Sequence, residues 1–80
     1  MKLPRDISGT ELADLLKRYG YSVTRQTGSH LRLTTQIGGE HHITIPSHPH
    51  LRIGTLNAIL VEVAQHLKKD KPELILEIWG

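Results

Sequence analysis

The spacing of the apolar residues changes from helical to extended and back to helical along this 80-residue chain, and that order restricts the fold more than any other feature. The first stripe, with members three and four residues apart, consists of Leu12, Leu15, Leu16 and Tyr19. Ser8-Gly9-Thr10-Glu11 precedes it with the pattern of a capping box, and Ile7 is placed as a hydrophobic staple. Gly20 follows and supplies a left-handed terminus. The pattern predicts a helix over residues 8–19.

The next segment, from Tyr21 to Ile45, alternates apolar and polar residues, which is typical of half-buried strands. Gly28 marks one turn and Gly38-Gly39 a second, so the pattern predicts three strands in an antiparallel meander. The inward-facing residues are expected to be Tyr21, Val23, Leu31, Leu33, Ile43 and Ile45. The opposite face is expected to carry His30, Arg32, Thr34, His42 and Thr44. One face is therefore expected to be packed and the other polar and cationic.

Helical spacing returns after a loop at Pro46-Ser47-His48-Pro49-His50, whose prolines cannot continue a central strand. The second helix is predicted from about Gly54 to Lys68, with an apolar stripe at Leu56, Ile59, Leu60, Val63 and Leu67. Asp70 is a candidate N-cap for a short third helix, although the following residues also alternate as in a strand. The predicted fold class is α+β: a double-stranded-RNA-binding-domain-like α-β-β-β-α order, with a three-stranded antiparallel sheet, two helices on one face and a short C-terminal helix.

Composition limits the protein class. Residues 1–80 are expected to form a single domain, because half of so short a chain could not bury a core of its own. The chain has no Cys, its N-terminus lacks an apolar signal segment, and its longest apolar run is residues 58–61, so no membrane segment is expected and the cytoplasm is the expected compartment. The net charge is +2 with three aromatic residues. Nucleic-acid binding would therefore depend on charge and shape rather than on base stacking.

The most informative segment is Gly28-Ser29-His30, where a glycine turn delivers an imidazole to the start of the middle strand on its exposed face. Imidazole can transfer protons near neutral pH. Arg32 lies on the same predicted face, Arg25 precedes the turn, and His42 lies on the neighbouring strand. By itself this pattern also fits an ordinary polar strand.

Taken together, the ordered motifs over residues 8–67 resemble the HicA toxin family, the YcfA-like messenger-RNA interferases of bacterial type II toxin–antitoxin modules. The shared residues are Glu11-Leu12, Leu15-Leu16, Gly20-Tyr21, Arg25-Gln26, Gly28-Ser29-His30, Ile43-Thr44-Ile45-Pro46, His48, Leu51, Gly54-Thr55-Leu56 and Ile59-Leu60. The resemblance implies an α-β-β-β-α fold, cleavage of messenger RNA with His30 as the catalytic residue, and neutralisation by a HicB-type antitoxin. Residues 69–80 form an extension whose apolar face is expected to pack on the body or on a partner, which leaves a homo-oligomer open.

Chemically, one imidazole is sufficient for RNA cleavage because the 2′-hydroxyl of RNA is the nucleophile, so we expect no cofactor. His30 is the candidate general base or acid, and Arg32 and Arg25 are candidate phosphate ligands. Gly28 and Ser29 would present backbone N–H groups, and His42 is the candidate second proton carrier.

A metal site is the competing interpretation of the histidines, since His41, His42, His48 and His50 lie within ten residues. Adjacent strand residues point to opposite faces and no Cys contributes, so no metal is expected. His66 is interpreted as a helix-end or surface residue, and Trp79 as a packing lid. The alternative functions are a non-catalytic RNA-binding module of the same fold and a purely structural interaction domain.

Overall fold

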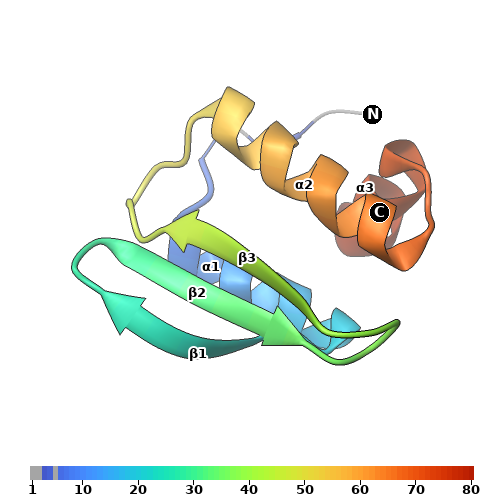
Figure 1. Cartoon of the computed structure of the whole chain (residues 1–80). Coiled ribbons are helices and arrows are strands. Elements are labelled where there is room, and N and C mark those ends of the chain that lie inside the picture. Colours follow the sequence, from blue (N-terminus) through green and yellow to red (C-terminus); the bar gives the residue numbers. More distant parts are fainter. Residues whose placement is uncertain (1–2, 5) are drawn as a thin grey trace.

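The computed structural model describes residues 3–4 and 6–80. Its elements are α1 (Gly9–Leu15), the 3-10 helix η1 (Leu16–Tyr19), β1 (Ser22–Thr27), β2 (His30–Thr35), β3 (His41–Pro46), α2 (Ile53–Leu67) and α3 (Lys71–Trp79). The strands form one antiparallel sheet in the order β1-β2-β3. Figure 1 shows α1 behind this sheet, with α2 and α3 toward the β3 side. The predicted α+β class with its α-β-β-β-α order is confirmed.

The first helix begins with the predicted capping box. The Ser8 hydroxyl accepts a hydrogen bond from the Glu11 backbone N–H at 3.1 Å, and the Glu11 carboxylate accepts one from the Ser8 N–H at 3.0 Å. These two bonds satisfy backbone donors that the first helical turn leaves without partners. The last turn tightens into η1 and ends at Gly20, whose φ of 83° is left-handed as predicted.

The sheet buries one face, and β2 and β3 follow the predicted alternation. Leu31, Leu33, Ile43 and Ile45 are buried against the helices. The prediction for β1 was wrong at Val23, which is 45% exposed, and every residue of β1 is exposed. The physical reason is that α1 and α2 both pack against β3, so the helical layer does not cover β1. Tyr21 is buried as expected, immediately before the strand begins.

The interior is aliphatic and extends from the sheet to all three α-helices. Its fully buried hydrophobic side chains are Tyr21, Leu12, Leu16, Leu33, Ile45, Leu56, Leu60, Leu74 and Val63. The third helix is confirmed, and it packs on the body because Leu74 and Ile75 are buried whereas Leu76 is exposed. Glu77 secures it, accepting hydrogen bonds from Tyr19 Oη at 2.7 Å and Lys69 Nζ at 2.8 Å. Trp79 is partly buried against the core, as a packing lid would be.

The start of α1 rests directly on the end of β3. A Cβ atom built on Gly9 would lie 1.9 Å from the carbonyl oxygen of Pro46, so only glycine fits there. Pro46 was predicted to begin a loop, but it is the last residue of β3 and pairs with His30. Proline is tolerated there because a strand end needs no further ladder donor. The backbone N–H of Ser47 then donates to the Ser29 carbonyl at 2.7 Å, so this contact supports the turn that carries His30.

Candidate active site

The outer face of the sheet gathers the predicted cationic side chains. The register pairs Arg25 with Arg32 across β1 and β2, and Arg32 with Thr44 across β2 and β3, so these side chains share one face. His30, Arg32 and Arg25 are all exposed. The helices lie on the other face, which leaves the outer face open to a large ligand such as a nucleic acid.

His30 occupies the first position of β2, directly after a two-residue turn. Thr27 and His30 are paired across that turn, and Gly28 has a φ of 54°, which is left-handed backbone that glycine adopts without strain. A Cβ on Gly28 would meet no atom within 4 Å, so glycine is favoured at this position by its backbone conformation and not by lack of space. The turn thus presents an exposed imidazole at the end of the sheet, with the backbone of Gly28 and Ser29 beside it.

Arg32 is the predicted partner of His30 that lies on the same strand, β2. It lies two residues further along the same strand, and the strand period places it on the same face, roughly 7 Å away along the backbone. Arg25 lies opposite Arg32 on β1. Guanidinium groups bind phosphate oxygens through two parallel hydrogen bonds. This pair of arginines therefore suits the phosphodiester backbone of a nucleic-acid strand that passes His30.

His42, the candidate second proton carrier, does not lie next to His30. It pairs with Thr34, four residues along β2 from His30 and hence roughly 13 Å away along the strand. Its Nδ1 lies 2.7 Å from Thr34 Oγ1 and its Nε2 lies 2.8 Å from Glu40 Oε2. The His42 hydrogen bond is the largest influence that lowers the pKa of the Glu40 carboxyl, and Gln36 adds to it. Both ring nitrogens are therefore engaged in a chain that continues from Thr34 to Thr24 at 2.9 Å.

A second histidine cluster lies on the inner side of the sheet and was not found from the sequence. Tyr21 Oη lies 2.7 Å from His41 Nδ1, and the His41 ring stacks on His66 with ring centroids 4.3 Å apart. His66 Nε2 donates to the Ile37 carbonyl at 2.9 Å, so His66, which lies in the last turn of α2 as predicted, also joins this helix to the β2–β3 turn. Burial, then the neighbouring His66, lowers the pKa of His41. Only the proximity of two distant segments creates this cluster, and no local pattern encodes it.

The histidines do not gather as metal ligands. His41 points to the inner side and His42 to the outer face, as predicted for adjacent strand residues. His48 is exposed, and His50 pairs with Asp6 on the helical side. Over residues 3–4 and 6–80, no three His, Cys, Asp or Glu side chains come together in a way that could hold a metal ion.

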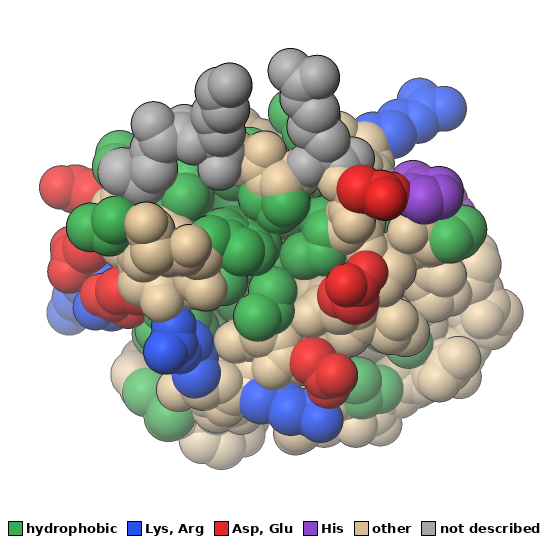
Figure 2. Space-filling view, turned by 180° about the vertical axis from the view of Figure 1, so that it is seen from behind, with side chains coloured by type: hydrophobic (Ala, Val, Ile, Leu, Met, Phe, Trp, Pro, Cys, Tyr) green, Lys and Arg blue, Asp and Glu red, His purple; other side chains and the backbone are tan. Residues whose placement is uncertain are grey.

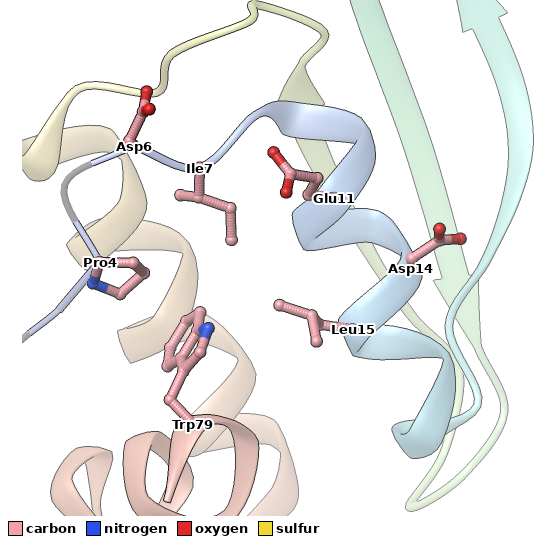
Figure 3. Close-up of a pocket in the computed structure, with 7 residues that line it drawn as sticks. All are labelled: Pro4, Asp6, Ile7, Glu11, Asp14, Leu15 and Trp79. Carbon is pink, nitrogen blue, oxygen red and sulfur yellow. The ribbon is translucent and has the colours of Figure 1, made fainter.

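A hollow of ≈370 Å³ opens on the helical side, between the N-terminal segment, α1 and α3. Figure 2 shows hydrophobic side chains gathered in this region with acidic side chains beside them. In Figure 3, Ile7, Leu15 and Trp79 point toward one another, and the carboxylates of Asp6 and Glu11 lie at the margin. Carboxylates repel phosphates, so this hollow does not suit RNA, and the outer face of the sheet remains the candidate site.

Comparison with known families is decisive for the chain as a whole. A family model described as the HicA toxin of bacterial toxin–antitoxin systems matches residues 9–70. The chain belongs to the HicA toxin family. The match to HicA begins at the first residue of α1 and includes the sheet, the His30 turn and α2. It ends at Asp70, so α3 lies outside the matched residues.

No curated protein and no solved structure matches this HicA chain. In the part of the chain that the structure describes, none of the helices is both long enough and apolar enough to cross a membrane. Family membership identifies the protein as the toxin of a toxin–antitoxin system and implies that it has an antitoxin partner.

Proposed function

We propose that the protein is a metal-independent endoribonuclease that cleaves messenger RNA in the cytoplasm and is neutralised by a HicB-type antitoxin. The observation that carries the proposal is the exposed His30 imidazole, held by the Gly28-Ser29 turn on a face that also presents Arg25 and Arg32. Membership of a toxin family supports the same conclusion independently of the geometry. The exposure of His30 matters most, because an imidazole sealed in the core could not reach a phosphodiester.

The proposed reaction is a transesterification within the RNA. His30 accepts the proton of the 2′-hydroxyl while the 2′-oxygen forms a bond to the adjacent phosphorus, and the bond from phosphorus to the 5′-oxygen breaks. The leaving 5′-oxygen takes its proton from water, the resulting hydroxide takes the proton that His30 accepted, and the products are a 2′,3′-cyclic phosphate and a 5′-hydroxyl. A positioned proton acceptor of this kind accelerates such steps by roughly 10²–10⁴-fold. No metal ion or other cofactor enters this scheme.

Charge stabilisation is assigned to the groups beside His30. Arg32 holds the reacting phosphate and offsets the charge that develops on its oxygens, and the backbone N–H groups of Gly28 and Ser29 assist it. Arg25 holds a neighbouring phosphate. His42 supports the outer face through Thr34 and is not the second proton carrier, because its ring nitrogens are engaged and it lies roughly 13 Å from His30 along the strand.

Inducible expression in a bacterial host tests the proposal. We expect the wild-type chain to arrest growth and degrade bulk transcripts, and His30→Ala to do neither although it accumulates to the same level. His50→Ala is the matched control, since His50 is also exposed but pairs with Asp6 on the helical side, and it should arrest growth like the wild type. Growth arrest by His30→Ala with loss of transcripts would refute the catalytic role. RNA binding without any transcript loss by the wild type would favour the non-catalytic RNA-binding module.

A further inference from the structure

β1 is an open edge of the sheet. The strand order places β2 on one side of β1, and no other strand of the described residues pairs with it. All six residues of β1 are exposed, and Figure 1 shows the strand at the side of the sheet away from α2. An open edge presents unpaired backbone N–H and C=O groups, which an extended segment of another chain can pair with.

Beneath β1 the molecule has a hollow of ≈270 Å³, bounded on the other side by α1. Val23, Ala13 and Leu31 provide apolar surface to it, and Val23 is the large hydrophobic side chain that the sheet leaves 45% exposed there. The rest of the lining is polar: Asp14 and Lys17 form an exposed ion pair at 2.9 Å, and Thr10 and Gln26 lie beside the apolar residues. The inner side of this edge is therefore suited to apolar side chains.

The outer side of the same edge has the opposite character. Arg25 points to the outer face beside Arg32, whereas Val23, paired with Leu33, faces inward. Side chains of an added strand would alternate in the same way, with one set directed into the hollow and the other toward Arg25. Apolar residues match the first environment and acidic residues match the second.

We propose that β1 and the hollow beneath it are the docking site for an extended strand of the antitoxin, in which apolar and acidic side chains alternate. This inference rests on the proposed function, because it assigns a mode of neutralisation to the same cationic face. A strand added to β1 places its carboxylates roughly 5 Å from Arg25 and roughly 10 Å from Arg32, since neighbouring strands are spaced at that interval. Those carboxylates would compete for Arg25 with the neighbouring RNA phosphate that the proposed function assigns to this arginine.

A second copy of this chain fits the edge less well. If two β1 strands paired antiparallel along their whole length, the two-fold axis would lie between Thr24 and Arg25, and the Arg25 side chains of both copies would approach each other on the outer face, which is destabilising. On its inner side β1 has Val23 and the polar Gln26. A second copy that paired through β1 would therefore bring a single apolar side chain to the hollow, which does not fill it.

Calorimetric titration of the 80-residue toxin with the purified antitoxin encoded beside it tests the proposal. Val23→Asp introduces a charge into the apolar hollow, and we expect it to weaken binding at least about tenfold, equivalent to 1.4 kcal/mol. Val23→Thr keeps the β-branched shape and should give a smaller loss. Ile53→Asp is the matched control, because Ile53 is 48% exposed but lies at the start of α2, and its binding should equal that of the wild type.

Amide hydrogen exchange of the wild-type complex provides a test without substitutions. We expect residues 22–27 to gain protection when the antitoxin binds. Unchanged exchange of these amides, or equal affinity of Val23→Asp and wild type, would overturn the docking site. If the toxin forms a concentration-dependent homodimer that Val23→Asp dissociates, the proposal is overturned and the edge binds a second copy of the chain. If Val23→Asp loses RNA cleavage but keeps full antitoxin affinity, the proposal is overturned and the edge binds RNA. We expect Val23→Asp to cleave RNA at the wild-type rate. Because cleavage and antitoxin binding are measured separately, failure of the ribonuclease proposal can be distinguished from failure of the docking site.

Discussion

Replacement of Gly9 by alanine tests whether close backbone contact between α1 and β3 holds the site together. The new Cβ would lie 1.9 Å from the Pro46 oxygen and 2.9 Å from the Pro46 carbonyl carbon, whereas ordinary contact begins at 3.4 Å. The two backbones must therefore separate by about 1.5 Å, the difference between 3.4 and 1.9 Å. Overpacking of this kind costs about 1–3 kcal/mol, and disruption of the hydrogen bond from Gly9 N–H to the His48 carbonyl adds about 1 kcal/mol.

The gain in helix propensity offsets up to about 1 kcal/mol, so we expect Gly9→Ala to lower the free energy of unfolding by roughly 1–4 kcal/mol. For a domain of this size that corresponds to a melting temperature lower by roughly 4–32 °C, measured by circular dichroism. Gly54→Ala is the control, because Gly54 is also near a helix start but its Cβ would meet no atom within 4 Å. It should be neutral or stabilising. Equal melting temperatures for Gly9→Ala and the wild type would refute the contact and the argument that the Pro46 end of β3 supports the His30 turn.

Three further substitutions test other parts of the account. Leu74→Ala should lower the free energy of unfolding in urea by about 2–5 kcal/mol because Leu74 is fully buried under α3, whereas Leu76→Ala, at a 54% exposed position, should change it by less than about 0.5 kcal/mol. Folding lowers the pKa of His41, so the unfolded chain binds a proton more readily than the folded chain, and the free energy of unfolding should fall as the pH drops below 6.5. His41→Gln should make that decline less steep between pH 6.5 and 5. Arg32→Ala should weaken RNA binding and reduce its salt dependence, measured by fluorescence anisotropy across a salt series. Arg52→Ala should do neither, because Arg52 is also exposed but lies at the start of α2.

Each of these expectations has a clear contrary result. A stable protein after Leu74→Ala would mean that α3 does not complete the core. A decline in stability with acid that is as steep in His41→Gln as in the wild type would mean that other groups cause it. Equal effects of Arg32→Ala and Arg52→Ala would mean that RNA is bound by net charge and not by the outer face of the sheet.

The elements encoded by local patterns could be predicted from the sequence. The capping box at Ser8 and the left-handed Gly20 are short-range signals, and the structure contains both. The alternation in β2 and β3 placed Leu33 and Ile45 in the core and His30 and Arg32 outside it. Local signals were sufficient there because each depends on a few neighbouring residues and on one buried face.

The features that the sequence did not predict depend on contacts between segments that are distant along the chain. Val23 has the same alternation as the core residues, but a hollow separates it from α1, and sequence spacing does not reveal how closely a helix packs on a strand. The stacking of His41 on His66 depends on the β2–β3 turn meeting the end of α2. His42 shares a face with His30 as predicted, but a shared face does not give the distance along a strand, and the register places His42 opposite Thr34, roughly 13 Å from His30.

The central claim is that a single exposed imidazole, without a metal, performs the chemistry. The most direct measurement is the initial rate at which the purified toxin cleaves an RNA oligonucleotide in excess EDTA, with the product ends identified by mass spectrometry. We expect cleavage by the wild type to give a 2′,3′-cyclic phosphate, and His30→Ala to be slower by roughly 10²–10⁴-fold with RNA affinity nearly unchanged. A wild-type rate that requires Mg²⁺, or one that His30→Ala retains, would contradict the account.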